Sequence, residues 1–183
     1  MPKNLPRQLT SFVGREDVLA NIATLVARSP LFTLVGTGGA GKTRCAVQAG
    51  ADMFDGSGDG VWLVELAPLS DPSLVASAVA QALGAQEAPS RPLLETLLAY
   101  LRRKRLLLVL DNCEHVIAEV RTVAAVLLRA CPEVRILATS REGLNISGEE
   151  VYRMASLAVP PPGATLTPQT GFWNRRGSTP ARS

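Results

Sequence analysis

Aromatic side chains are scarce in this sequence: phenylalanine, tryptophan and tyrosine make up 4% of 183 residues, so leucine, valine and alanine must fill the core. No apolar run reaches the roughly 18 residues that a membrane-spanning helix needs. The N-terminal segment MPKNLPRQLT also lacks the apolar stretch of a secretory signal peptide. These absences argue against a membrane protein and predict a cytoplasmic one.

Cysteine is also sparse, and its three copies are scattered: Cys45, Cys113 and Cys131 form no CxxC pair. An odd number at these spacings disfavours both a disulfide framework and a zinc site. Cys45 and Cys113 fall on expected helices. We expect them to pack as small apolar side chains.

An overall excess of charge is missing once the C-terminal tail is set aside. The net charge is +3, and residues 160–183 contain three arginines and no acidic residue. The remaining 19 − 3 = 16 basic residues equal the 16 acidic ones. The folded part therefore has no basic field of the kind that binds nucleic acid. No helix-turn-helix can be placed either, so we expect no DNA contact from this chain.

Two kinds of segment alternate along the chain. Short apolar runs predict strands at 31–35, 61–66, 106–110, 134–140 and 150–154. Helical periodicity lies before and between them, at 14–29, 43–54, 72–83, 90–105 and 114–131. This alternation is typical of an α/β fold, a three-layer sandwich in which helices cover both faces of a parallel sheet.

The ends of these helices carry recognisable signals. Asp71 is a candidate cap for the third helix, with Pro72 at its first position and Gly84 after its end. Ser90 or Arg91, before Pro92, repeats that design in the fourth. Four bases, residues 102–105, end the fourth helix, where they would oppose the negative end of the helix dipole. A contact with a phosphate backbone is the alternative.

Composition suggests the domain limits. Residues 1–12 form a polar leader with two prolines, and residues 13–159 form the folded domain. Residues 160–183 are rich in proline, glycine, serine and threonine and show no periodicity, so we expect a disordered tail or linker.

A glycine-rich turn lies between the first strand and the second helix. Its sequence GTGGAGKT, residues 36–43, matches the phosphate-loop motif GxxxxGK[ST] in full. Backbone N–H groups of such a loop wrap a polyphosphate, and glycine adopts the required conformations cheaply. Lys42 would pair with the β- and γ-phosphates, and the Thr43 hydroxyl would bind Mg²⁺. The residues expected to bind the nucleotide here are Gly36, Thr37, Gly38, Gly39, Ala40, Gly41, Lys42, Thr43 and Arg44.

A carboxylate at the end of a neighbouring strand would complete this site. LLLVLD supplies Asp111 after five apolar residues, which is the Walker B pattern, and Asp111 would hold Mg²⁺ directly or through water. The alternative is that Asp111 caps the helix expected from Glu114.

The residue that would orient a water for hydrolysis is less evident. Asn112 follows Asp111, and an amide can orient a water but cannot accept its proton. Glu114 and Glu65 are further candidates, although solvated or structural roles are open for both. We therefore expect slow turnover or tight retention of product.

Two more polar side chains lie near the expected site. Arg141 follows the fourth strand, where open α/β sheets bind ligands, so it could contact the γ-phosphate; an exposed loop arginine is the alternative. His115, the only histidine, is expected to pack near the Walker B turn rather than to catalyse.

Five segments, in this order, resemble the nucleotide-binding domain of STAND-type signalling ATPases, and among these the bacterial NB-ARC-like ATPases attached to LuxR-type or SARP-type transcriptional regulators. The resemblance covers about residues 5–159 and is carried by SFVGRE (11–16), GTGGAGKT (36–43), VWLVELAPLSDPSLV (61–75), LLLVLDNCEH (106–115) and ILATSRE (136–142).

The resemblance implies a P-loop NTPase fold with strand order 5-1-4-3-2. It also implies that Val13 and Gly14 line an adenine pocket with Arg15 nearby, and that Arg141 is the arginine that senses the γ-phosphate. The family acts as a switch that is closed with ADP and open, able to self-associate, with ATP. Its members continue into a small helical domain that residues 160–183 do not resemble. The sequence is therefore expected to be a truncated or frameshifted product, or a stand-alone domain.

The function expected from these observations is a regulatory ATP/ADP-binding domain with slow Mg²⁺-dependent hydrolysis. It would act with other domains of a larger regulator or by self-association. The alternative is an interaction scaffold that holds its nucleotide without turnover. A metabolic kinase is disfavoured, because no arginine-rich lid and no acceptor-binding segment are visible.

Overall fold

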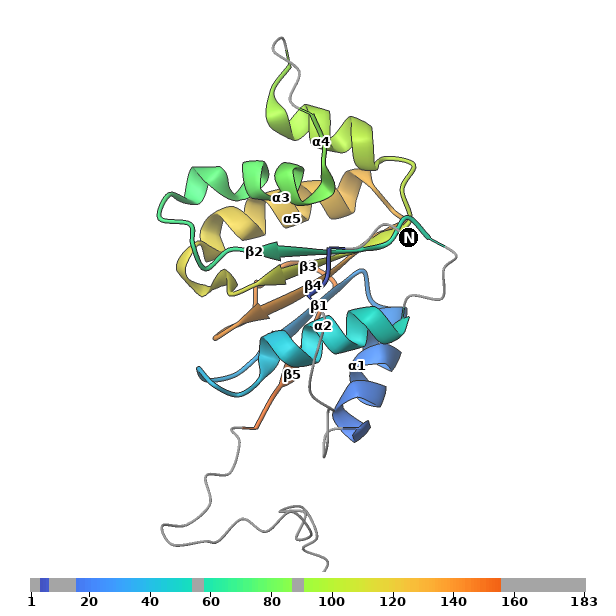
Figure 1. Cartoon of the computed structure of the whole chain (residues 1–183), viewed down its shortest axis with the longest axis vertical. Helices are drawn as coiled ribbons and strands as arrows, with labels where there is room; N and C mark the ends of the chain where they lie inside the picture. The colour runs from blue at the N-terminus through green and yellow to red at the C-terminus, as the bar shows by residue number, and fades with distance from the viewer. Residues whose placement is uncertain (1–3, 7–15, 54–57, 87–90, 156–183) are drawn as a thin grey trace, which may run out of the picture.

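A parallel sheet of five strands forms the centre of the molecule in the computed structural model, which describes residues 4–6, 16–53, 58–86 and 91–155. The strand order is β2-β3-β4-β1-β5, and every neighbouring pair is parallel (Figure 1). Read from the other edge, this is the expected order 5-1-4-3-2, so the prediction of a P-loop NTPase fold is confirmed. The strands are β1 (Leu31–Val35), β2 (Val61–Glu65), β3 (Leu106–Asp111), β4 (Val134–Ser140) and β5 (Glu149–Arg153).

Helices cover both faces of this sheet, as Figure 1 shows. One face packs against α1 (Glu16–Arg28) and α2 (Lys42–Met53). The other packs against α3 (Val75–Leu83), α4 (Leu93–Leu101) and α5 (Ile117–Ala130). The sheet therefore lies between two apolar cores, and β1, β2, β3 and β4 are buried along most of their length, whereas the edge strand β5 is partly or fully exposed.

The alternation of side chains along β3 decides which way its last residue points. Leu106, Leu108 and Leu110 belong to the core under α3, α4 and α5. Leu107 and Val109 belong to the core under α1 and α2. Asp111 continues the second series, because side chains two positions apart share a face of a strand. Its carboxylate therefore lies on the α2 side of the sheet, where the phosphate loop begins that helix.

The fourth helix is shorter than expected. Pro92 lies at its N-cap rather than inside it, and the helix ends at Leu101, so its last turn contains no basic residue. The basic run therefore begins at the C-cap, Arg102, and follows the helix rather than forming its last turn. Within this run, Lys104 pairs with the Asp59 carboxylate at 2.8 Å, which also accepts from the Arg105 backbone N–H at 2.9 Å. Asp59 thus ties the start of β3 to the start of β2.

Short 3-10 turns modify two other helix starts. The Asp71 carboxylate accepts from the Ser73 N–H at 2.9 Å and caps η1 (Pro72–Leu74), which leads into α3. Gly84, at φ 66°, ends α3 as expected. After β3 the chain forms η2 (Cys113–His115), and α5 begins at Ile117 rather than at residue 114. Cys113 therefore lies on this turn and not on a helix, although it is buried as expected.

Some expectations fall outside the described residues, among them the adenine-pocket residues Val13, Gly14 and Arg15 and the tail 160–183. Asn4, within the described residues, uses its side-chain amide to bond both the N–H and the carbonyl of Leu63 at the free edge of β2. None of the described helices has the length and apolar character needed to cross a membrane.

Candidate functional site

The phosphate loop joins the end of β1 to the start of α2. Gly39 and Gly41 adopt φ of 75° and 78°, the left-handed region that other residues enter only with strain. Among the described residues, no hydrogen bond engages the backbone N–H groups of Gly38, Gly39 or Gly41. These donors, together with the positive end of α2, suit an anion with several oxygens.

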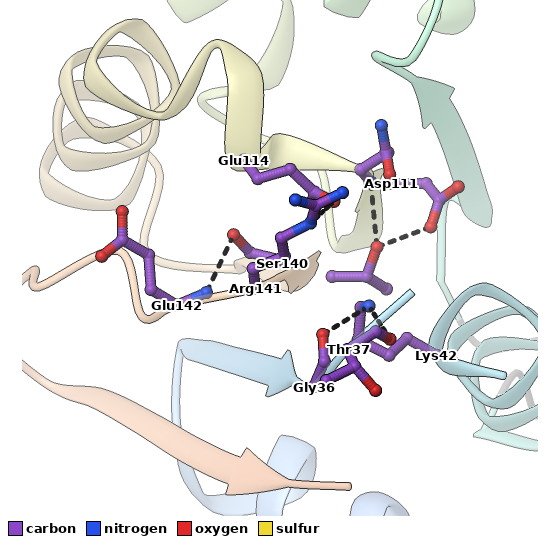
Figure 2. Close-up of polar contacts among 10 residues, drawn as sticks. Gly36, Thr37, Lys42, Asp111, Glu114, Ser140, Arg141 and Glu142 are labelled. Atoms are coloured by element: carbon purple, nitrogen blue, oxygen red, sulfur yellow. Dashed lines mark hydrogen bonds and ion pairs between the residues drawn. The ribbon is translucent and has the colours of Figure 1, made fainter. Parts of the chain in front are cut away.

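Lys42 folds back over this loop. It is only 9% exposed, and its Nζ donates to the carbonyl oxygens of Gly36 at 2.8 Å and Thr37 at 3.0 Å (Figure 2). Both acceptors are neutral and belong to the loop itself. The ammonium group is thus already positioned at the rim of the loop, where an incoming phosphate would offer it a stronger, charged acceptor.

Asp111 is the centre of a small polar network that joins three elements. Its Oδ1 accepts from the Thr43 hydroxyl of α2 at 2.7 Å and from the Thr139 hydroxyl of β4 at 2.6 Å. The Asn112 N–H in turn donates to the Thr139 oxygen at 2.9 Å. The N-cap residues of η2 and α5 are Asn112 and Val116, and neither makes a side-chain cap, so the alternative of Asp111 as a helix cap is wrong. The structure brings the two expected metal ligands, Thr43 and Asp111, into direct contact.

Thr139 is the member of this network that the sequence did not single out. It is 1% exposed and lies near the carboxyl end of β4, next to β3. The only signal was its place within ILATSRE, one residue before the strand ends. A threonine in a strand is ordinary, and only the pairing of β3 with β4 places its hydroxyl beside a carboxylate.

Arg141 and Glu114 form an ion pair beside this network. Arg141 follows β4, and its Nε lies 3.3 Å from Oε1 of Glu114 in η2 (Figure 2). The Arg141 side chain is 71% exposed, whereas that of Glu114 is 18% exposed. The other carboxylate oxygen of Glu114 is buried and has no hydrogen-bond partner. Arg141 is therefore a mostly exposed cation that pairs with a mostly buried carboxylate.

The remaining candidates have different surroundings. Glu65 is exposed at the end of β2 and lies opposite Asp111 in the strand register. Asn112 adopts a left-handed backbone with φ 65°. His115 is exposed, and one of its ring nitrogens lies 2.9 Å from the Leu66 carbonyl oxygen, directly after β2.

The donors of the site fit Mg²⁺ and a polyphosphate. A hydroxyl and a carboxylate are the hard oxygen ligands that Mg²⁺ takes, usually one or two of them together with water and phosphate oxygens. No group of three or more histidine, cysteine or acidic side chains within the described ranges is arranged to hold a metal ion. A hydroxyl and a carboxylate beside the N–H donors of the loop would suit phosphate oxygens and Mg²⁺ together.

Known proteins share parts of this sequence and its fold. A Mycobacterium tuberculosis (strain ATCC 25618 / H37Rv) protein, provisionally named an HTH-type transcriptional regulator, is 42% identical over 136 residues. The match covers 74% of this chain but 15% of that protein, so this chain spans a small part of such a relative.

Solved structures share the fold at low sequence identity. Cdc6p from Pyrobaculum aerophilum superposes with a TM-score of 0.59 at 16% identity, over 84% of this chain and 48% of that one. A signal transduction ATPase with numerous domains (STAND) and a tetratricopeptide repeat sensor, from Pyrococcus horikoshii, gives 0.55 at 14% identity, over 84% and 25%. Residues 27–147 match the model of one family, described as the AAA domain. The chain belongs to this AAA domain family.

Proposed function

We propose that this domain binds ATP and ADP with Mg²⁺ and serves as the nucleotide-responsive part of a STAND-type regulator. The observation that carries the proposal is the 2.7 Å hydrogen bond between Thr43 and Asp111, which joins the phosphate loop to the end of β3. It assembles a hydroxyl and a carboxylate beside a buried lysine. This is the set that phosphoryl-transfer sites use to hold a metal-bound triphosphate.

The hydrogen bonding of Asp111 is compatible with metal binding. A hydroxyl has one donor and two acceptor sites, so Thr43 can keep its bond to Asp111 while a lone pair faces Mg²⁺. Both hydroxyl contacts use Oδ1, and no described residue donates a hydrogen bond to Oδ2. Oδ2 is thus free to accept from a metal-bound water. Mg²⁺, when bound, supplies the charge that offsets the phosphate oxygens.

The roles of the other residues follow from their positions. The loop N–H groups and Lys42 would hold the β- and γ-phosphates, and Arg141 would reach the γ-phosphate from the end of β4. Val13, Gly14 and Arg15 are proposed to line the adenine pocket. Competition of ATP against GTP in the binding assay below tests this last assignment, since an adenine pocket predicts weaker competition by GTP.

Calorimetric titration with ATP and ADP in the presence of Mg²⁺ tests the proposal. We expect binding in the micromolar range or tighter, and its loss in Lys42→Ala. Lys104→Ala is the matched control, because Lys104 lies just before the amino end of β3, paired with Asp59, whereas the phosphate loop follows the carboxyl end of β1. A folded wild-type protein that binds neither nucleotide refutes the proposal, as does equal weakening by the two substitutions.

Hydrolysis is proposed to be slow. Asn112 occupies the position after Asp111, where an acidic residue would serve as a base, and an amide cannot take a proton from water. The second candidate function, a scaffold that keeps its nucleotide without turnover, rests on this same observation. Phosphate release above the background of Asp111→Asn supports the slow ATPase, and release equal to that background supports the scaffold.

The regulatory role belongs to a longer protein. We infer that a domain of this kind, within a regulator like the mycobacterial relative, changes its contacts with neighbouring domains or with further copies of itself when ADP is replaced by ATP. The absence of a basic excess in residues 1–159 supports protein contacts rather than DNA contacts for this part. Light scattering of the domain with ADP and with a non-hydrolysable ATP analogue would detect self-association.

A further inference from the structure

Lys42 and Arg141, two cations of the site, are held by different kinds of acceptor. Lys42 donates to two neutral carbonyl oxygens, whereas Arg141 lies beside the carboxylate of Glu114. A neutral carbonyl gives up a donor easily, because water or a neighbouring group can replace it. A carboxylate that is 82% buried does not give up its counter-charge easily, because desolvated charges need a partner.

The charge of Glu114 is only partly compensated even with Arg141 in place. The contact to Arg141 uses Oε1 at 3.3 Å, and Oε2 is buried without a partner. If Arg141 turns away, both oxygens are left in a poorly solvated place. Arg141 is itself mostly exposed, so its movement would disturb little packing. The resistance to that movement therefore comes from Glu114.

We propose that Glu114 competes with the γ-phosphate for Arg141 and thereby sets how strongly the site prefers ATP over ADP. This inference rests on the proposed function, since it presupposes nucleotide binding. ADP has no γ-phosphate, so its binding leaves the pair of Arg141 and Glu114 intact. ATP must draw the guanidinium away from a charged partner, so the penalty falls on ATP alone.

A double-mutant cycle tests the competition through equilibrium binding, so hydrolysis is not needed. Four proteins are compared: wild type, Glu114→Gln, Arg141→Ala and the double variant. Glutamine keeps the shape of glutamate and removes its charge. The readout is the dissociation constant for ADP divided by that for a non-hydrolysable ATP analogue, both with Mg²⁺. Glu119→Gln, in the first turn of α5, is the control for the same substitution elsewhere.

Competition between Glu114 and the γ-phosphate for Arg141 predicts that the two single substitutions shift this ratio in opposite directions. Glu114→Gln should raise the ratio by about five- to tenfold, through tighter binding of the ATP analogue, and Glu119→Gln should leave it unchanged. Arg141→Ala should lower the ratio towards one. The double variant should match Arg141→Ala within about twofold, because Glu114 acts through Arg141.

Four outcomes would overturn the inference. A fall in the ratio for Glu114→Gln means that Glu114 positions Arg141 for the phosphate instead of competing for it. If Glu114→Gln raises the ratio equally in the wild type and in Arg141→Ala, Glu114 acts on the nucleotide by its own charge and not through Arg141. An unchanged ratio, with both nucleotides still bound, removes the inference and leaves the proposed function standing. Failure of the wild type to bind either nucleotide removes both.

Discussion

The polar network around Asp111 predicts that one buried threonine stabilises the fold and another does not. Thr139 and Thr33 are 1% and 0% exposed and lie on the adjacent strands β4 and β1. The Thr139 hydroxyl donates to Asp111 at 2.6 Å and accepts from the Asn112 N–H at 2.9 Å. The Thr33 hydroxyl has no hydrogen-bond partner. Substitution by valine therefore removes a hydrogen-bonded hydroxyl group at Thr139 and a hydroxyl group without a hydrogen bond at Thr33.

The expected magnitudes follow from the bonds that are lost. In Thr139→Val, a hydrogen bond to a charged acceptor is removed, worth roughly 1.5–3 kcal/mol. The Asn112 N–H also loses its acceptor, which costs about 1–3 kcal/mol and less where water reaches it. Valine recovers part of this through its extra methyl group, so we expect a net loss of about 3 kcal/mol in the free energy of unfolding. Thr33→Val should be neutral or stabilising by about 1 kcal/mol, because an unsatisfied hydroxyl is removed from the core.

Urea unfolding of the three proteins, followed by far-ultraviolet circular dichroism, measures this difference directly. The Mg²⁺ dependence of nucleotide binding supplies a second readout. Thr139→Val removes the hydrogen bond that fixes Asp111, so it should weaken the metal affinity by about tenfold or more. Removal of the hydrogen-bond partners of metal ligands commonly has an effect of this size. Thr33→Val should leave the metal affinity unchanged. If the two variants unfold within about 1 kcal/mol of each other, the network does not stabilise the protein in the way its geometry implies.

Three further predictions concern other parts of the structure. Gly58→Ala should lower the melting temperature, because the added Cβ would lie 2.6 Å from the Arg105 carbonyl oxygen, a backbone atom that cannot move aside cheaply; an unchanged melting temperature would mean that this turn adjusts freely. Hydrogen bonding to Lys104 and to the Arg105 N–H lowers the pKa of Asp59, so the stability that the carboxylate contributes should be present above pH 3.8 and lost as the pH falls through its lower folded pKa. The stability gap between wild type and Asp59→Asn should accordingly narrow in acid, and a gap that is constant from pH 7 to pH 2 contradicts this. Burial raises the pKa of the Cys113 thiol, so iodoacetamide at pH 8 should modify it only in urea, as mass spectrometry can establish.

Contiguous signals in the sequence were sufficient for most of the fold. The apolar run of β3 lies directly before Asp111. The glycine-rich turn likewise lies directly before Lys42. Local patterns of this kind fix a strand, a turn and the start of a helix together. The order of the strands came from the resemblance rather than from the patterns, because periodicity does not say which strands are neighbours. The catalytic and binding roles of the site residues remain predictions for the experiments above.

The parts that sequence reasoning missed depend on contacts between distant segments. The basic run after Leu101 continues a helical pattern, but Asp59 holds Lys104 and the Arg105 N–H at the start of β3, so the helix stops before them. Thr139 is separated from Asp111 by a whole helix and meets it only through the pairing of β3 with β4. Such partners are set by strand register and by which face a residue occupies.

The same geometry decides which substitution is the cleanest test of nucleotide binding. Asp111 is both a proposed metal ligand and the acceptor for two hydroxyl groups, those of Thr43 and Thr139. Its substitution therefore weakens the junction of three elements as well as the site, and lost binding would not separate these effects. Lys42 donates only to carbonyl oxygens of its own loop at the rim of the site, and those oxygens can turn to water when the ammonium is removed. A binding defect in Lys42→Ala at unchanged stability therefore reports on the phosphates themselves.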